Sequence, residues 1–300
     1  MNAEQLRQRL AARPPPVLVQ VLPEEVFAAQ RIPHSGNACV YEMTFLERMA
    51  SLAPDKAAQV IVYGAGEGSR DAEAAREKLL AAGYTNVEVF AEGLTGWERA
   101  GLPCEGAGAL AAPPPLSGTF AVNAAESVLR WTGRNLFNHH HGTVKLSAGR
   151  IVIEHGALVS AQFSIAMDSI ACEDLADASV NAMLLRHLHD ADFFDVSRHP
   201  RATFVAERAE RLEPGTEGTP NFVLHGQFTL RGITRPLAVP IVVASADGQR
   251  ITGQAQFEVD RTEFGSIYGS GRFFRFLGGH VVNDHIHLHV KLHADRTPAV

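Results

Sequence analysis

Apolar and polar residues alternate with a period of two in the C-terminal two-thirds of the chain, and this pattern constrains the fold most. In 221–230, the residues Phe222, Leu224, Phe228 and Leu230 share one face, and 285–292 reads His-Ile-His-Leu-His-Val-Lys-Leu. Successive side chains of a strand point to opposite faces, so each stretch predicts a strand with one buried face. Turns rich in Gly, Asp and Pro separate the stretches. We therefore expect an antiparallel β-sandwich or barrel.

A further alternating stretch, 156–167, is predicted to place Val159, Phe163 and Ile165 on one inward face. One helix is expected around 179–189, where the sequence SVNAMLLRHLH breaks the alternation.

The N-terminal region has a different pattern. Short apolar runs at 17–21, 60–63 and 87–90 flank a stretch rich in helix formers at 71–82, which Gly83 ends. Strands that alternate with helices predict a small α/β domain with a parallel sheet. The sequence GAGALAAPPPL then reads as a semi-rigid linker. We therefore divide the chain into an α/β domain at 1–105, a linker at 106–117 and an all-β domain at 118–297.

The composition argues against a nucleic-acid-binding, membrane-spanning or secreted protein. The net charge is −6, with 33 acidic against 27 basic residues, which argues against nucleic acid as a partner. No window approaches 18 consecutive apolar residues, and residues 1–16 lack the apolar core of a secretory signal, so we expect a cytoplasmic location. Cys39, Cys104 and Cys172 form no closely spaced pair, which suits a reducing compartment.

Motifs along the all-β region resemble the YceI-like family. Ser127 and Trp131 occupy the family's S-x-x-x-W positions, and His141–Leu146 follows. The later motifs are Met167–Ile170, Asp192–Val196, His199–Phe204, Gly226–Pro236, Asp260–Gly265 and Asn283–Ile286. The succession covers roughly 180 residues, about the length of one domain. It is specific because all the motifs occur in order.

The resemblance implies a lipocalin-like antiparallel barrel whose apolar lumen holds an isoprenoid, a quinone or a similar fatty lipid, without a cofactor. An eight-stranded barrel is wide enough for one slender ligand. The same alternation fills the core of any barrel, so part of the predicted set would only pack. The predicted lumen residues are Trp131, Phe163, Ile165, Phe204, Phe228, Phe257, Ile286 and Leu288.

Five polar residues in these motifs are expected to have structural roles: Asp168, Ser169, Asp192, Asp195 and Arg261. An Asp at a turn commonly caps the local backbone. Arg261, at a strand end, is placed to pair with one of these carboxylates across the barrel rim.

Histidines are frequent, with 14 in the chain. Residues i and i+2 of a strand point the same way, so His285 and His287 could share a metal ion with His141. The aliphatic residues between them are predicted to face inward, however. We therefore expect these histidines on the outer, solvated face, and no metal site.

The N-terminal region resembles the rhodanese-like family less closely, through Val17–Pro33, Val60–Tyr84 and Glu92–Pro103. Active members use a cysteine directly after the central strand, where loop N–H groups surround its sulfur. Here that position is Gly64, and the loop residues Gly66, Gly68, Ser69 and Arg70 supply no thiol. A serine hydroxyl would need an adjacent base. We therefore expect no sulfur transfer through this loop, and a scaffold or docking role for the domain.

Two other interpretations stay open at this point. The chain could be an enzyme, either a sulfurtransferase that uses Cys39 or a metal-dependent enzyme that uses the barrel histidines. An apolar setting keeps a thiol inert, which argues against Cys39 as a nucleophile. Alternatively, both domains could serve as interaction surfaces around a filled barrel. The sequence leaves the oligomeric state open.

Overall fold

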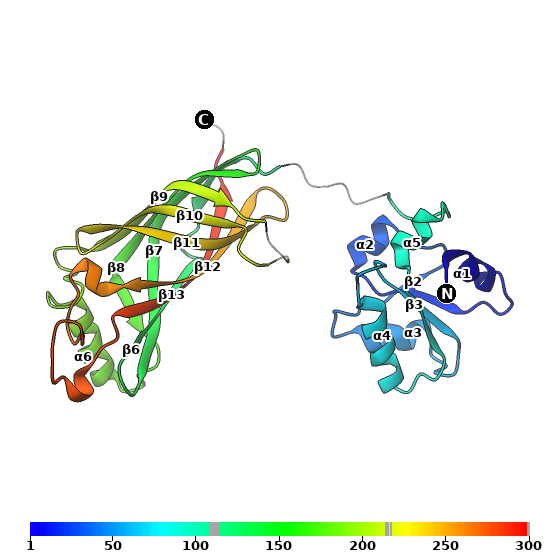
Figure 1. Cartoon of the computed structure of the whole chain (residues 1–300), viewed down its shortest axis with the longest axis horizontal. Helices are drawn as coiled ribbons and strands as arrows, with labels where there is room; N and C mark the ends of the chain where they lie inside the picture. Colours follow the sequence, from blue (N-terminus) through cyan, green and yellow to red (C-terminus); the bar gives the residue numbers. More distant parts are fainter. Residues whose placement is uncertain (109–114, 214–215, 217, 299–300) are drawn as a thin grey trace. The chain divides into compact units, whose positions relative to one another are not determined.

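The computed structural model describes residues 1–108, 115–213, 216 and 218–298 and contains two compact units, Met1–Pro113 and Pro114–Val300 (Figure 1). The first is an α/β unit with a parallel sheet, and the second is a closed eight-stranded antiparallel barrel, as predicted. Half of the predicted linker, residues 109–114, lies outside the described residues. No helix in the described part of the chain has the length and apolar character needed to cross a bilayer.

The first unit has a four-stranded sheet in the order β2-β1-β3-β4, with every pair parallel. Its strands are β1 (Val17–Gln20), β2 (Gly36–Asn37), β3 (Val60–Tyr63) and β4 (Val87–Phe90). Its helices are α1 (Ala3–Leu10), α2 (Glu24–Ala29), α3 (Phe45–Leu52), α4 (Asp71–Ala81) and α5 (Gly93–Arg99). The predicted strands and the predicted helix at 71–82 are confirmed.

Both faces of this sheet are buried, which explains its continuous apolar strands. On one face, Val62 belongs to a cluster with Met49 of α3 and Leu79 of α4. On the other face, Tyr63 belongs to a cluster with Leu6 of α1 and Trp97 of α5. The unit therefore has two apolar layers, one on each side of the central strand.

The second unit is a single sheet that closes on itself. Its strands are β5 (Gly118–Val122), β6 (Val128–Arg134), β7 (His139–Glu154), β8 (Ala157–Cys172), β9 (Arg201–Arg211), β10 (Phe222–Leu230), β11 (Ile233–Ala244), β12 (Arg250–Asp260) and β13 (His285–Arg296). Pairing of β12 with β13 closes the barrel. Both β5 and β6 pair with β7 and with β13, so these two segments share one of the eight strand positions.

The predicted alternation is confirmed in most strands. Phe222, Leu224, Phe228 and Leu230 of β10 are buried on one face. The prediction for Val159 is wrong, because this side chain is exposed. A β-bulge shifts the register of β8 against β7 at this point, and a bulge reverses the facing of the residues beyond it.

One helix, α6 (Ala178–His189), covers one end of the barrel and confirms the helix predicted at 179–189 (Figure 1). The Asp177 side chain caps it by accepting the amides of Ser179 and Val180. The connection from β12 to β13 lies at the same end and contains two short 3₁₀ helices, Arg261–Phe264 and Gly278–His280. Leu188, near the end of α6, joins the barrel core.

The Tyr63 hydroxyl is buried in the first unit, where it accepts the Ile32 amide at 2.9 Å and contacts the Ser35 hydroxyl at 2.9 Å. Burial raises the pKa of Tyr63 to about 12, above its ordinary value near ~10. The unfolded chain therefore loses this proton at lower pH than the folded chain. The stability contributed by neutral Tyr63 is complete below about pH 10 and decreases as the pH rises towards about 12.

We predict that Tyr63→Phe flattens the alkaline decrease in stability of this unit, by up to ~1.4 kcal/mol for each pH unit in that window. At neutral pH the variant should lose about 1–2 kcal/mol, since the buried Ile32 amide loses its acceptor. Urea unfolding monitored by Trp97 fluorescence in a Trp131→Phe background measures both effects. An identical alkaline slope with and without the Tyr63→Phe substitution would contradict the prediction.

Candidate functional site

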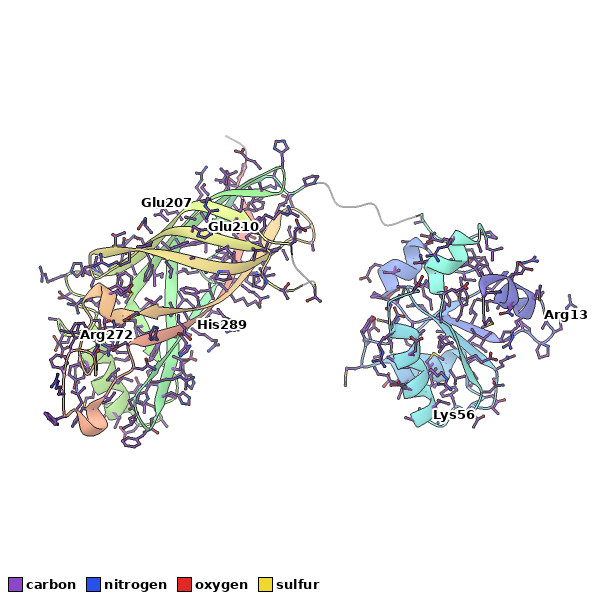
Figure 2. All side chains as sticks on the ribbon, in the orientation of Figure 1. Arg13, Lys56, Glu207, Glu210, Arg272 and His289 are labelled. Atoms are coloured by element: carbon purple, nitrogen blue, oxygen red, sulfur yellow. The ribbon has the colours of Figure 1, made fainter. Side chains whose placement is uncertain are left out.

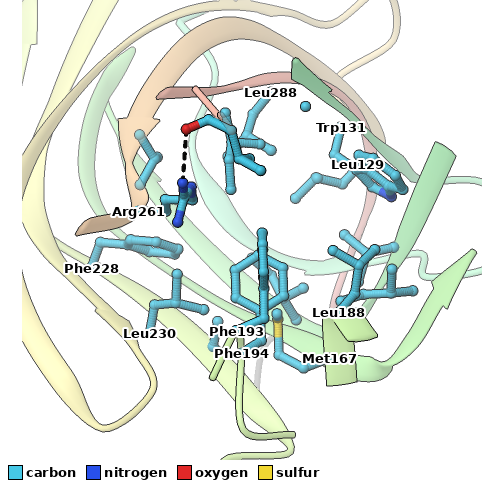
Figure 3. A pocket seen from close by; sticks show the side chains of 18 of the residues that line it. Leu129, Trp131, Met167, Leu188, Phe193, Phe194, Phe228, Leu230, Arg261 and Leu288 are labelled. Carbon is cyan, nitrogen blue, oxygen red and sulfur yellow. Dashed lines mark hydrogen bonds between the residues drawn. The ribbon is translucent and has the colours of Figure 1, made fainter. Parts of the chain in front are cut away.

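The barrel encloses a cavity beneath α6 and the β12–β13 connection (Figure 3). Its volume is about 100 Å³, by the measure in which one water needs ~10–15 Å³, so it has room for roughly seven to ten waters. Apart from Arg261 and Asn283, the side chains around it are apolar. The lining includes Leu129, Trp131, Ile165, Met167, Leu188, Phe193, Phe194, Phe228, Leu230, Arg261, Asn283, Ile286 and Leu288.

A second cavity of about 70 Å³ lies further along the lumen. Its lining is wholly apolar and includes Leu146, Phe163, Phe204, Leu224, Leu237, Val239, Ile241, Phe257 and Val290. Four residues line both cavities: Leu129, Ile165, Phe228 and Leu288. The two cavities therefore adjoin, and these four side chains form the junction between them.

Every predicted lumen residue lines one of these cavities. Trp131 and Ile286 line the first, and Phe163, Phe204 and Phe257 line the second. Ile165, Phe228 and Leu288 stand at the junction. All eight residues therefore face the lumen, and their contact with a ligand stays a prediction.

The lumen prediction missed a group of residues that enter the cavity from outside the strands. Leu188 comes from α6, and Phe193 and Phe194 come from the turn that follows. The two phenylalanine rings meet edge to face, with centroids 4.8 Å apart. Their signal in the sequence is an adjacent Phe pair between two aspartates. Turn residues have no period that predicts which way they point, so alternation could not include them.

Arg261 is fully buried at the edge of the first cavity, directly after β12 (Figure 3). Its Nε donates to the Asn283 carbonyl at 3.0 Å, and Nη2 donates to the Val282 carbonyl at 3.0 Å. Nη1 donates to the Ser266 carbonyl. The guanidinium carbon also lies 5.3 Å from the centre of the Phe193 ring, in a cation–π contact. Arg261 therefore ties both ends of the β12–β13 connection to the barrel end.

The carboxylate partner predicted for Arg261 was the wrong one. Its nearest carboxylate is Asp284, whose Oδ1 lies 3.7 Å from Nη2, and neither Asp192 nor Asp195 pairs with it. Burial lowers the pKa of Arg261, and the charges of Asp284 and Asp260 oppose this shift. An arginine side chain stays protonated in proteins, so the barrel end holds a buried positive charge.

The histidines of β13 lie on the outer wall, as predicted, and Figure 2 labels His289 there. The register places Thr132 of β6 between His141 and His287, so those two backbones stand about two strand spacings, roughly 9–10 Å, apart. The His287 Nδ1 instead lies 3.1 Å from a Glu258 carboxylate oxygen. Within the described residues, no three His, Cys, Asp or Glu side chains form a group that could hold a metal ion. His285 is exposed at the start of the strand.

In the first unit, the carboxylate of Asp71, at the start of α4, lies beside Gly64 in the loop after β3. The Asp71 side chain is buried and accepts the Ala65 amide at 3.1 Å, the Ser69 hydroxyl at 2.7 Å and the Ala72 amide at 2.8 Å. A Cβ added to Gly64 would lie 1.9 Å from the Asp71 Oδ1. The chain's own carboxylate therefore occupies the space that a side chain at position 64 would need.

The remaining loop residues surround this carboxylate or face solvent. Gly66 is buried, Gly68 and Arg70 are exposed, and Glu67 pairs loosely with Arg99 at 3.8 Å. Cys39 is buried, and all three cysteines are free.

We predict that Gly64 and Asp71 are energetically coupled. Gly64→Ala should destabilise the first unit by about 1–3 kcal/mol because its methyl group overlaps the carboxylate. Asp71→Ala should cost about 1–3 kcal/mol because three donors lose their acceptor. The double variant should be more stable than the sum of the two effects implies, by at least about 1 kcal/mol. Urea unfolding of the wild type, both single variants and the double variant gives the four free energies of unfolding.

The exposed Glu77 on α4 supplies the control for this cycle. Gly64→Ala combined with Glu77→Ala should show simple additivity. Equal additivity in the Asp71 cycle would mean that the carboxylate does not fill the position.

Comparison with known proteins agrees with this architecture. The YceI-like domain matches residues 120–294, and the rhodanese-like domain matches residues 2–100. Comparison with curated proteins gives no match.

Solved structures resemble each unit in turn. BcnA of Burkholderia cenocepacia is 23% identical with a TM-score of 0.45, over 57% of this chain and 98% of that one. A polyisoprenoid binding domain from Saccharophagus degradans is 13% identical with a TM-score of 0.43, over 59% and 98%. The Alr3790 protein of Anabaena sp. is 26% identical with a TM-score of 0.32, over 35% and 91%. With the YceI-like match spanning more than half of its length, the chain belongs to the YceI-like family and carries a rhodanese-like domain before the barrel.

Proposed function

We propose that the barrel binds a lipid with a slender apolar chain, either an isoprenoid or a related quinone or fatty lipid, inside its lumen. The observation that carries this proposal is the pair of adjoining cavities along the barrel axis. The cavities adjoin at Leu129, Ile165, Phe228 and Leu288, and movement of these side chains would join them into one apolar space. A ligand that matches such a space is long, narrow and apolar.

The hydrophobic effect is sufficient to hold such a ligand. Each buried CH₂ group contributes about 0.8 kcal/mol, so a chain that spans both cavities gains affinity without any polar contact. The lining is preformed by strands on all sides, which limits the entropy lost on binding. Polar groups are then needed only to set the orientation of the ligand.

The lining suggests that orientation. The second cavity is lined by apolar residues throughout, whereas Arg261 and Asn283 contribute polar groups at the far end of the first. The apolar tail of the ligand would occupy the second cavity, and its polar end would lie towards Arg261. A quinone carbonyl or an isoprenoid head group suits the positive charge at that end.

The rhodanese-like unit is proposed to act as a scaffold or docking element. Asp71 fills the position next to Gly64, and its carboxylate takes the loop amide of Ala65 as a donor. A persulfide chemistry at this loop would need both a thiol and a free anion cradle. The unit has a complete core around this loop, so its proposed role is to present a binding surface and not to catalyse a reaction.

Filling the cavity junction tests lipid binding. Ile165 stands at the junction, and Val159 on the same strand is exposed. Native mass spectrometry, followed by organic extraction, should find a near-stoichiometric lipid in the wild-type chain. Ile165→Trp should lower lipid occupancy or affinity at least about tenfold, or ~1.4 kcal/mol.

Val159→Trp is the matched control, because it adds the same side chain outside the barrel and should retain the lipid. Leu288→Phe, a smaller increase in volume at the junction, guards against loss of folding in Ile165→Trp. Wild-type barrels that stay empty after incubation with isoprenoids and quinones would refute the proposal. Equal occupancy in both junction variants and in the control would place the ligand outside the lumen.

A further inference from the structure

The exposed phenylalanines of the described residues all lie on two loops at one end of the barrel. Phe137 belongs to the β6–β7 turn, and Phe273, Phe274 and Phe276 belong to the β12–β13 connection. Phe276 is completely exposed. We call residues 134–139 and 265–280 the end loops.

The end loops lie next to each other. Asn135 of the first forms a β-bridge with Val282, just beyond the second, and a Cβ on Gly279 would lie 3.7 Å from the Phe137 ring. Val282 also donates its amide to the Gly269 carbonyl at 2.8 Å. The aromatic side chains of both loops therefore belong to one surface.

This surface lies over the first cavity. Gly133 and Val282, which flank the end loops, both line that cavity. Ser266, Ser270 and Phe264 of the β12–β13 connection are buried, whereas Phe273, Phe274 and Phe276 are exposed, so these three rings point away from the barrel core. Figure 1 places α6 at the same end, and Figure 2 labels Arg272 there.

The charges on the end loops have one sign. They contain Arg134, Arg272 and Arg275 and no Asp or Glu, although the chain as a whole carries −6. Arg272 is paired with Asp260 at 3.1 Å and with Asp284 at 3.7 Å. In the part of the chain that the structure describes, Arg134 and Arg275 have no carboxylate within ion-pair distance.

Carboxylates also flank the end loops, and Asp192 on the turn after α6 lies 3.6 Å from His187, whose ring packs against Tyr268. Asp174, near the first loop, is engaged by the His140 ring at 2.8 Å. His139 and His280 are exposed and add positive charge when protonated. Glu263 is the exposed carboxylate that precedes the second loop.

Exposed aromatic rings next to unpaired arginines match the interface of an anionic bilayer. Aromatic side chains insert at the level of the headgroups, and arginines pair with lipid phosphates. Phe276 also has φ of +59°, in the left-handed region that is strained for a bulky residue. Because the Phe276 ring is completely exposed among the described residues, its burial contributes nothing there to offset this strain, whereas insertion into a bilayer would.

We infer that the end loops dock the barrel on the surface of an anionic phospholipid bilayer, with the first cavity facing the lipid. This inference rests on the proposed function in one respect, since a lipid-binding lumen needs a lipid store. A second copy of the chain fits less well. A two-fold interface would place this surface against an identical one, so Arg134 and Arg275 would face end loops that contain no Asp or Glu, which is repulsive.

Vesicle flotation with the full chain tests the inference. Vesicles of phosphatidylcholine and phosphatidylglycerol in equal parts, without isoprenoid, should carry the wild-type chain, and pure phosphatidylcholine vesicles should carry less. Phe273→Ser with Phe276→Ser should weaken binding roughly tenfold, because affinity scales with inserted apolar area. Arg275→Glu should weaken it at least about fivefold and reduce its dependence on salt.

Matched controls come from the opposite end of the barrel. Val159→Ser removes an exposed apolar side chain from β8, and Arg150→Glu reverses an exposed charge on β7. Both should bind vesicles as the wild type does. Ile165→Trp should also bind them normally, which separates docking from lumen binding.

Three outcomes would overturn the inference. The wild type fails to float with anionic vesicles, although it retains a lumen lipid. The end-loop variants bind as well as the controls. Light scattering shows a dimer that the Phe273→Ser/Phe276→Ser variant dissociates, while vesicle binding is absent.

Discussion

Pairing of β12 with β13 is the interaction on which the barrel depends, because it turns an open sheet into a closed one. The register sets Phe257 opposite Leu288 and Val259 opposite Ile286, so both pairs point into the lumen. The alternate pair, Glu258 and His287, then lies outside. A slip of one residue would turn the histidines inward and the aliphatic residues into water. Closure also removes the free edges through which a sheet could pair with other chains.

The same pairing fixes the end of the lumen. Because Asp260 is held opposite His285, the connection between these residues must fold back over the barrel end. Arg261 meets this requirement by donating to backbone carbonyls at both ends of the connection. A planar guanidinium can satisfy several carbonyls at once, and a lysine could not reproduce that geometry. These contacts and the buried Phe264 hold the start of the connection against the barrel, while Phe273, Phe274 and Phe276 stay exposed further along it.

A residue's position in the structure can be predicted from the sequence where it lies in a regular element with a fixed side-chain period. Phe228 and Leu288 lie in regular strands, and a period of two is enough to place them in the lumen. Val159 lies beyond a bulge, which leaves no mark on the hydrophobic pattern. Phe193 lies in a turn, where side-chain direction depends on tertiary contacts. The Arg261 partner was misassigned because ion pairs between distant segments require the folded backbone.

The loop after β3 is a second region whose side-chain contacts could not be predicted from the sequence. The sequence reveals that position 64 has no thiol. It does not reveal that the Asp71 carboxylate occupies the space that a side chain at position 64 would need. That carboxylate satisfies the Ala65 and Ala72 amides and the Ser69 hydroxyl, so the loop is stable without a bound anion. A loop that only lost its cysteine would keep an unfilled cradle of donors, at a cost in stability. The Asp71 carboxylate accepts these donors itself, so the loop avoids that cost without an external anion. The barrel differs from this loop, because its lumen contains cavities that its own side chains leave unfilled. The two units therefore differ in whether their own side chains fill the space at the candidate site.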